Sequence, residues 1–111
     1  MSWKDSAVTG NVGVETEAVT ANATLATTTD IAIVDSTAGA LVITLPSGTK
    51  QGQRAAVLFE VDGGDVTFDV TNITNVATSL TLADAGDYVD FVYCVALDAW
   101  TLVGNAGGVV V

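Results

Sequence analysis

The stretch from Asp84 to Val103 reads DAGDYVDFVYCVALDAWTLV, and the rest of the chain is expected to fold around it. Every odd position between residues 87 and 97 is apolar, whereas the even positions are mixed. An alternation of period two is typical of a long β-strand with one fully buried face. Residues 97–99 predict a tight reversal and residues 100–103 a partner strand. An isolated hairpin as apolar as this one is unstable in water, so the remaining residues must cover it.

The two faces of this strand predict different surroundings. The face expected to be buried carries Val89, Phe91, Tyr93, Val95 and Leu97, and we expect Trp100 to be buried against it. The opposite face includes Tyr88, Val92 and Cys94, which one small core cannot also cover. This second face therefore predicts contact with other chains.

The remaining segments predict an all-β domain. Residues 14–29 favour one or two short strands because they are rich in threonine, which disfavours helix. Further strands are expected at residues 30–35, 40–45, 53–61, 65–70 and around Leu80 and Leu82. Gly63-Gly64 between two β-rich runs predicts a hairpin. The spacing favours a compact antiparallel β-sandwich or barrel, jelly-roll-like, of about eight strands.

A chain of 111 residues is expected to form one domain with two distinct ends. Residues 1–13 are interpreted as an N-terminal arm, residues 14–105 as the β-sandwich domain, and residues 106–111 as a C-terminal apolar tail. A bare valine end offers an unpaired strand edge. We expect the ends to make contacts, and the candidate interface residues are Trp3, Lys4, Tyr88, Val109, Val110 and Val111.

Charge restricts the partners of the chain. The chain has thirteen acidic residues, three basic residues and no histidine, so its net charge is −10. A charge of this sign repels nucleic acid and anionic membrane surfaces. Only 14% of the residues are charged, although about a quarter is usual. We therefore expect apolar surface to be buried against copies of the same chain. The first ten residues lack a signal-peptide core, which predicts synthesis in a cytoplasm.

The sequence predicts no catalytic residue, no cofactor and no metal site. The absence of histidine excludes Ser/His and Cys/His pairs, and Cys94 is interpreted as a small buried hydrophobe. Two groups of aspartates, at residues 62–69 and 84–90, carry oxygens of the kind that calcium binds. Acids beside glycine turns are ordinarily solvated loop residues, and nothing places two carboxylates in an apolar cleft for glycoside hydrolysis. The chain is not expected to be an enzyme.

Several short motifs occur in a recognisable order. They are Ile43-Thr-Leu-Pro46, Gly52-Gln53, the Gly63-Gly64 turn, Leu80–Asp87 and Trp100-Thr-Leu-Val-Gly-Asn105. The series resembles small β-modules of tailed-bacteriophage virions, found as capsid decoration (cement) proteins and in tail fibres. The resemblance covers about residues 30–105 and implies a homotrimer without an active site. Residues 1–29 and 106–111 match no such pattern, so it implies no mode of attachment.

Two hypotheses follow from the resemblance. The first is a structural virion protein that binds the outer surface of an assembled phage capsid as a trimer and stabilises it. Its partners would be its own copies and the major capsid protein, and it would reside on the virion after synthesis in the host cytoplasm. The alternative is a receptor- or glycan-binding β-module of a tail fibre or other surface appendage. Met1 and the short length favour a stand-alone product, whereas glycan binding needs exposed aromatic residues, for which Trp3, Tyr88 and Trp100 are candidates.

Overall fold

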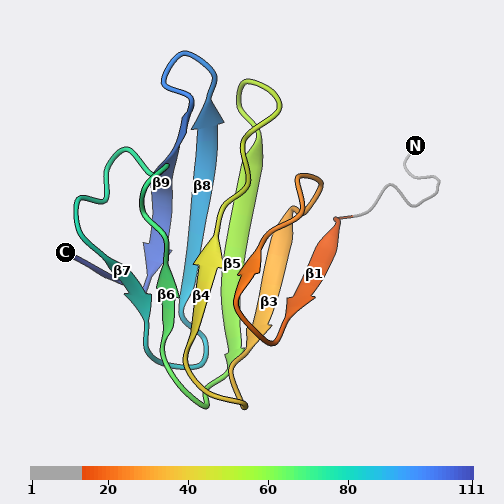
Figure 1. The fold of residues 1–111 in the computed structure, drawn as a ribbon, viewed down its shortest axis with the longest axis vertical. Coiled ribbons are helices and arrows are strands. Elements are labelled where there is room, and N and C mark those ends of the chain that lie inside the picture. The colour runs from red at the N-terminus through yellow and green to blue at the C-terminus, as the bar shows by residue number, and fades with distance from the viewer. Residues whose placement is uncertain (1–13) are drawn as a thin grey trace.

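The computed structural model describes residues 14–111, and this part of the chain is all-β (Figure 1). Its strands are β1 (Thr16–Val19), β2 (Ala23–Thr24), β3 (Ile31–Asp35), β4 (Leu41–Thr44), β5 (Arg54–Val61), β6 (Val66–Phe68), β7 (Leu80–Leu82), β8 (Tyr88–Cys94), β9 (Ala99–Ala106) and β10 (Val109–Val110). Residues 14–111 include no helix, and therefore none long and apolar enough to cross a membrane.

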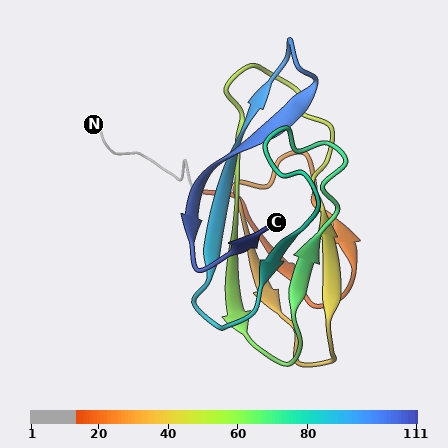
Figure 2. The ribbon, with the colours of Figure 1, turned by 90° about the vertical axis from the view of Figure 1, so that its left-hand side faces the viewer.

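Two five-stranded sheets pack face to face, as the side view in Figure 2 shows. Sheet A has the strand order β1-β3-β5-β8-β9, and sheet B has the order β10-β7-β6-β4-β2. The expected β-sandwich architecture is confirmed, with ten strands among the described residues rather than about eight. Strand β5, whose apolar residues on both faces predict a central position, lies in the middle of sheet A.

The first six strands form a coil in which the chain passes back and forth from one sheet to the other. They alternate between sheets A and B, so that β1, β3 and β5 are parallel neighbours in one sheet and β2, β4 and β6 in the other. The prediction of an antiparallel sandwich is therefore wrong, because both sheets are mixed. Period-two alternation predicts strands but is the same for parallel and antiparallel pairing.

The Gly63-Gly64 turn is a corner of this coil, and the predicted hairpin is wrong. It carries the chain from β5 in sheet A to β6 in sheet B. A Cβ atom on Gly63 would lie 2.3 Å from the carbonyl oxygen of Ser36, and one on Gly64 would lie 2.3 Å from the backbone nitrogen of Ala40. The two glycines are thus required because this corner packs directly on the corner between β3 and β4.

The last four strands pair antiparallel with their neighbours, and β8 and β9 form the predicted hairpin. Strand β8 ends at Cys94, however, and residues 95–98 form its turn. Val95 and Leu97 are 55% and 60% exposed, so their predicted burial is wrong. The turn needs Asp98 in the left-handed region at φ 48°, which breaks the alternation of the strand.

The core lies between the sheets and contains Val89, Phe91 and Tyr93 of the predicted inward face. Trp100 is fully buried, as predicted, and its ring meets that of Tyr93 edge-on with centroids 5.3 Å apart. The rings of Phe68 from sheet B and Phe91 from sheet A lie 5.8 Å apart and connect the two layers. Aromatic pairs in such geometry contribute about 0.5–1.5 kcal/mol beyond their burial.

The C-terminal segment is not a free tail in the structure. Strand β10 pairs with β7 at the edge of sheet B, and the Val111 amide donates to the Ser79 carbonyl at 2.9 Å. The backbone is therefore anchored on one side, which the apolar composition alone did not predict. The side chains of Val109, Val110 and Val111 remain 42–65% exposed.

Candidate functional site

The outward-facing surface of sheet A is unusually apolar for the outside of a small acidic protein. Alternation turns the even positions of β8 and their neighbours on β3 and β5 away from the core. We call this surface the outer A face; its apolar residues are Ile31, Ile33, Ala56, Leu58, Tyr88, Val92 and Cys94. Ala56 is buried, and the other six residues are half-buried because their side chains pack against one another across adjacent strands.

The strand register makes this surface continuous. Ile33 lies opposite Leu58, and Leu58 lies opposite Tyr88, so three large side chains cross β3, β5 and β8 in one row. A second row joins Ile31, Ala56 and Asp90. Residues opposite each other on adjacent strands pack laterally, so the rows form one patch rather than scattered contacts.

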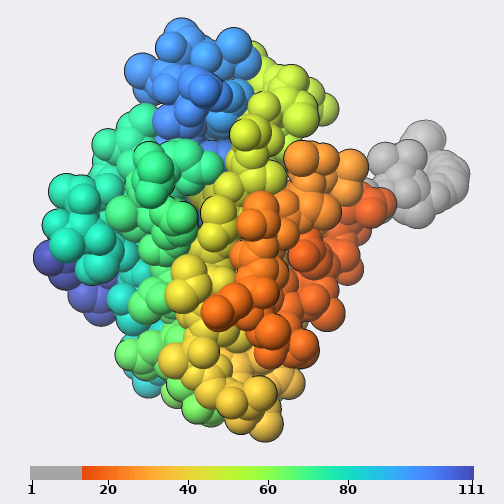
Figure 3. Space-filling view, in the orientation of Figure 1, coloured from red at the N-terminus to blue at the C-terminus, as the bar shows by residue number. Residues whose placement is uncertain are grey.

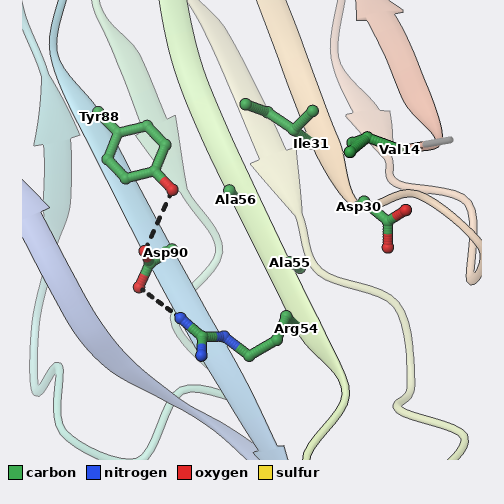
Figure 4. A pocket seen from close by; sticks show the side chains of 8 residues that line it. All are labelled: Val14, Asp30, Ile31, Arg54, Ala55, Ala56, Tyr88 and Asp90. Carbon is green, nitrogen blue, oxygen red and sulfur yellow. Dashed lines mark hydrogen bonds and ion pairs between the residues drawn. The ribbon is translucent and has the colours of Figure 1, made fainter. Parts of the chain in front are cut away.

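One ion pair interrupts the apolar rows. The Arg54 guanidinium lies 3.6 Å from Oδ1 of Asp90, and the Tyr88 hydroxyl donates a 3.1 Å hydrogen bond to Oδ2 of the same carboxylate (Figure 4). Burial and then this hydrogen bond raise the pKa of Tyr88 above its ordinary value. Gly104 on β9 leaves room for the pair, because a Cβ there would lie 2.7 Å from Oδ1 of Asp90. The charges on the middle of the face therefore cancel.

A shallow hollow opens beside this pair. It measures about 290 Å³, and its lining includes Val14, Ile31, Arg54, Tyr88 and Asp90. Figure 4 shows residues from β3, β5 and β8 around it, with Val14 at the side where the described chain begins. The lining combines an apolar floor with the Arg54–Asp90 ion pair and a second carboxylate, that of Asp30.

The predicted interface residues fall in separate places. Tyr88 lies on the outer A face, as its even position in the strand predicts. Val109, Val110 and Val111 lie at the edge of sheet B, where β10 ends the sheet. Trp3 and Lys4 lie outside the described residues.

Sequence reasoning missed the part of the outer A face that lies outside β8. The sequence pattern places Ile31, Ile33 and Leu58 in strands but does not predict that they form an outward surface. The signal was present in the continuous apolar run of β5, where both Val57 and Leu58 are large and apolar. A strand that is apolar on both faces needs cover on both faces, and here only one face meets sheet B.

A second apolar feature is the tip of the β8–β9 hairpin. It protrudes beside the loop of residues 48–53 at one end of the molecule (Figure 3). The Val95 amide donates to Oε1 of Gln51 at 2.9 Å, and the Gly52 amide donates to the Tyr93 carbonyl at 3.0 Å. These bonds hold the exposed Val95 and Leu97 side chains on an ordered support.

A polar groove of about 400 Å³ lies between residues 27–30 and 49–54. Its lining includes Lys50 and Arg54, two of the three basic residues of the chain, together with several threonines. Gln53 spans the groove by donating from Nε2 to the Thr27 carbonyl at 2.9 Å. No aromatic ring lines it, so a stacking platform for a sugar is missing from this groove.

Three aspartates of the two groups at residues 62–69 and 84–90 make other interactions. Asp87 accepts the backbone amides of Ala83 and Asp84 through Oδ2, both at 3.1 Å, and Asp90 pairs with Arg54. The hydroxyl and then the amide of Thr71 lower the pKa of Asp69. Within residues 14–111, no three acidic or cysteine side chains converge in a way that could hold a metal ion.

Comparison with known proteins gives a likeness of fold. No family model matches the chain, and no curated protein is similar to it in sequence. A chain in a solved structure described as "Structure of a chaperone-substrate complex" is similar, with a TM-score of 0.59 and 16% identity. The likeness covers 85% of this chain but only 17% of the other, so this chain corresponds to a small part of a longer one.

Proposed function

We propose that this chain is a structural virion protein, a trimeric decoration protein that binds the outside of an assembled phage capsid and stabilises it. The observation that carries the proposal is the outer A face. Contiguous apolar patches of this kind on small proteins mark interaction surfaces. A chain whose most distinctive surface is apolar and flat is suited to assembly rather than to enclosing a substrate.

The motif series between residues 30 and 105 supports the choice of a virion protein, because it resembles the β-modules of phage capsids and tail fibres. The charge supports an assembled shell rather than nucleic acid or membrane as the partner, since the chain carries a net charge of −10. The proposal includes no catalytic step and no cofactor. Its partners are copies of this chain and the major capsid protein, on the capsid surface.

Stabilisation would arise by mass action. A protein that binds only the assembled shell shifts the equilibrium toward that shell, by about 2.7 kcal/mol at a hundredfold excess over the dissociation constant. The exposed valines of β10 and the segment containing Trp3 are the proposed contacts with the capsid. Strand β10 is an edge strand, so its outer side can pair with a strand of a partner.

Co-sedimentation with expanded capsid shells of the phage that encodes the chain tests this function. We expect the full chain to sediment with the shells and to raise their resistance to heat. Deletion of residues 1–10, or replacement of Val109 and Val111 by threonine, should weaken binding. The threonine variant keeps the backbone pairing of β10, which a deletion would destroy.

Val42→Thr is the matched control, because Val42 is 39% exposed on the outer side of sheet B, away from β10. Failure of the full chain to sediment with shells would contradict the proposed function. Retention of full binding by both altered ends would instead move the contact to the loops, where the tip with Val95 and Leu97 is the alternative.

A receptor- or glycan-binding module of a tail fibre is the second candidate. The polar groove between residues 27–30 and 49–54 favours it, because Lys50 and the threonines of its lining can bind polar groups of a receptor without an aromatic platform. Binding of the purified protein to host cells or cell-wall glycans, abolished by Lys50→Ala, would support this alternative. Binding that Lys50→Ala leaves unchanged would count against the groove.

A further inference from the structure

We propose that the outer A face is the surface by which copies of this chain contact one another, with three copies turning this face toward a common three-fold axis. The number of copies rests on the proposed function, which calls for a trimer. The surface itself follows from the structure, and the argument for a second copy as the occupant has three parts.

The first part is the incomplete cover of sheet A. Its inner face is sealed by sheet B, whereas the row of Ile33, Leu58 and Tyr88 on the outer face meets no other described element. The outer side of sheet B needs less cover, because it carries Thr44, Thr67 and Thr81 beside the exposed Val42. The two outer faces of the sandwich therefore differ in character, and that of sheet A is the more apolar.

The second part is charge. A copy of an acidic protein is repelled by most of the surface of another copy. Within residues 14–111, however, the charges on the middle of the outer A face are those of Arg54 and Asp90, which form an ion pair. A charge close to a three-fold axis would meet its own copies on both neighbours, so a face that is neutral in its centre is the one that copies of this chain can share.

The state of Asp90 agrees with a surface that is completed by assembly. Its Oδ1 atom is buried yet receives no hydrogen bond from the described residues, and the Arg54 side chain near it is 61% exposed. Buried polar atoms without partners are rare in finished structures. Exclusion of water by neighbouring copies would strengthen the attraction between the guanidinium and this oxygen.

The third part is area. The strands of the outer A face, β3, β5 and β8, are about 4.8 Å apart and cover roughly 320 Å², and the flanking strands β1 and β9 extend the outer surface of sheet A to roughly 500 Å². Roughness of the side chains adds to this projected area, which brings it close to the roughly 600–800 Å² per partner of a specific interface. The face is thus large enough for a stable contact between copies and too flat to enclose a small ligand.

Light scattering on the size-separated full chain tests the proposal. We expect a particle of three times the chain mass of 11.2 kDa for the wild type and a monomer for Leu58→Asp. Val42→Asp, a charge placed on a central strand on the outer side of sheet B, should leave the trimer intact. A wild type that is monomeric at 100 µM, or a Leu58→Asp variant that remains trimeric, would overturn the proposal.

Cys94 supplies a second measurement that does not depend on the variant folding. It is the one cysteine of the chain and lies on the outer A face. Reaction of its thiol with a bulky disulfide reagent should be at least tenfold slower in the concentrated wild type than after dilution to monomers. Equal rates at both concentrations, with a trimer present at the higher one, would show that the contact lies elsewhere.

Two further results separate the possible failures. Removal of residues 1–13 should preserve the trimer; if this deletion alone yields monomers, the N-terminal segment makes the contact and the proposal is wrong. A trimer that does not sediment with shells would refute the capsid function and leave the interface standing. A Leu58→Asp protein that is still trimeric and binds shells would refute the interface and leave the capsid function standing.

Discussion

The indole Nε1 of Trp100 donates a 2.8 Å hydrogen bond to the carbonyl oxygen of Pro46. Trp100 lies on β9 of sheet A, and Pro46 follows β4 of sheet B, so this buried bond connects the two layers. The bond gives a partner to the one polar atom of the Trp100 side chain. It also gives a donor to the carbonyl of Pro46, which is buried as well.

Replacement of Trp100 by alanine should lower the free energy of unfolding by about 3–5 kcal/mol, because it leaves a large cavity in a packed core. Trp100→Phe should cost less, since it keeps an aromatic ring against Tyr93 and loses the bond to Pro46. Chemical denaturation of both variants in a Trp3→Phe background gives the comparison. A neutral Trp100→Ala variant would contradict the packing seen here.

Ser36 is fully buried and holds two corners of the coil together. Its hydroxyl oxygen accepts the amides of Gly63 at 2.9 Å and Gly64 at 3.1 Å, and the hydroxyl donates to the Gly64 carbonyl at 2.7 Å. Ser36→Ala should destabilise the fold by about 1–2 kcal/mol, because the two part-buried glycine amides lose their acceptor and the Gly64 carbonyl loses a donor. Thermal unfolding beside Ser47→Ala, an exposed serine, measures the difference.

Gly64 should tolerate no side chain. A Cβ at this position would meet the backbone of Ala40, and overpacking of this kind costs about 1–3 kcal/mol. Gly52→Ala is the control, because Gly52 has a positive φ of 79° but open space around its Cβ position, so it pays only conformational strain of about 1 kcal/mol. A Gly64→Ala protein as stable as Gly52→Ala would refute the close packing of the corners.

Alkaline pH should destabilise the fold through its tyrosines. The hydrogen bond to Asp98, and then burial, raise the pKa of Tyr93 above its ordinary value of 10.0. The unfolded chain therefore loses this proton first, and the stability that is complete below pH 10 falls as the pH rises above it. Absorbance titration in a Tyr88→Phe background should show that Asp98→Asn returns the pKa of Tyr93 toward 10.0. An unchanged midpoint would exclude Asp98 as the cause.

The positions of the strands could be read from the sequence, but their partners could not. The run of residues 53–61 became β5, and the alternation of Val66 and Phe68 gave the inward face of β6. The Gly63-Gly64 turn was misinterpreted because glycine serves equally where a hairpin needs a positive φ and where two backbones come into contact. Only the neighbouring corner at Ser36 distinguishes the two uses, and it lies 27 positions away in sequence from Gly63.

The candidate site could be predicted only in part for a similar reason. The even positions of β8 identify Tyr88, Val92 and Cys94 as outward residues from one strand alone. The contribution of Ile33 and Leu58 depends on β3 and β5 being the next strands in the sheet, which local patterns do not encode. Strand order is a property of the whole chain, and so is the surface that it creates.

The coil also has a consequence for the order of folding. The strands β1, β3 and β5 are neighbours in sheet A, but a strand of sheet B lies between each of them and the next in the sequence. Each of these pairings therefore closes a longer loop. The pairing of β8 with β9 closes a much shorter loop, since a turn of only four residues joins the two strands. Early closure of local contacts costs less chain entropy. Although the coil precedes the hairpin in the sequence, we therefore expect β8 and β9 to pair first and the parallel strands of the coil to pair later.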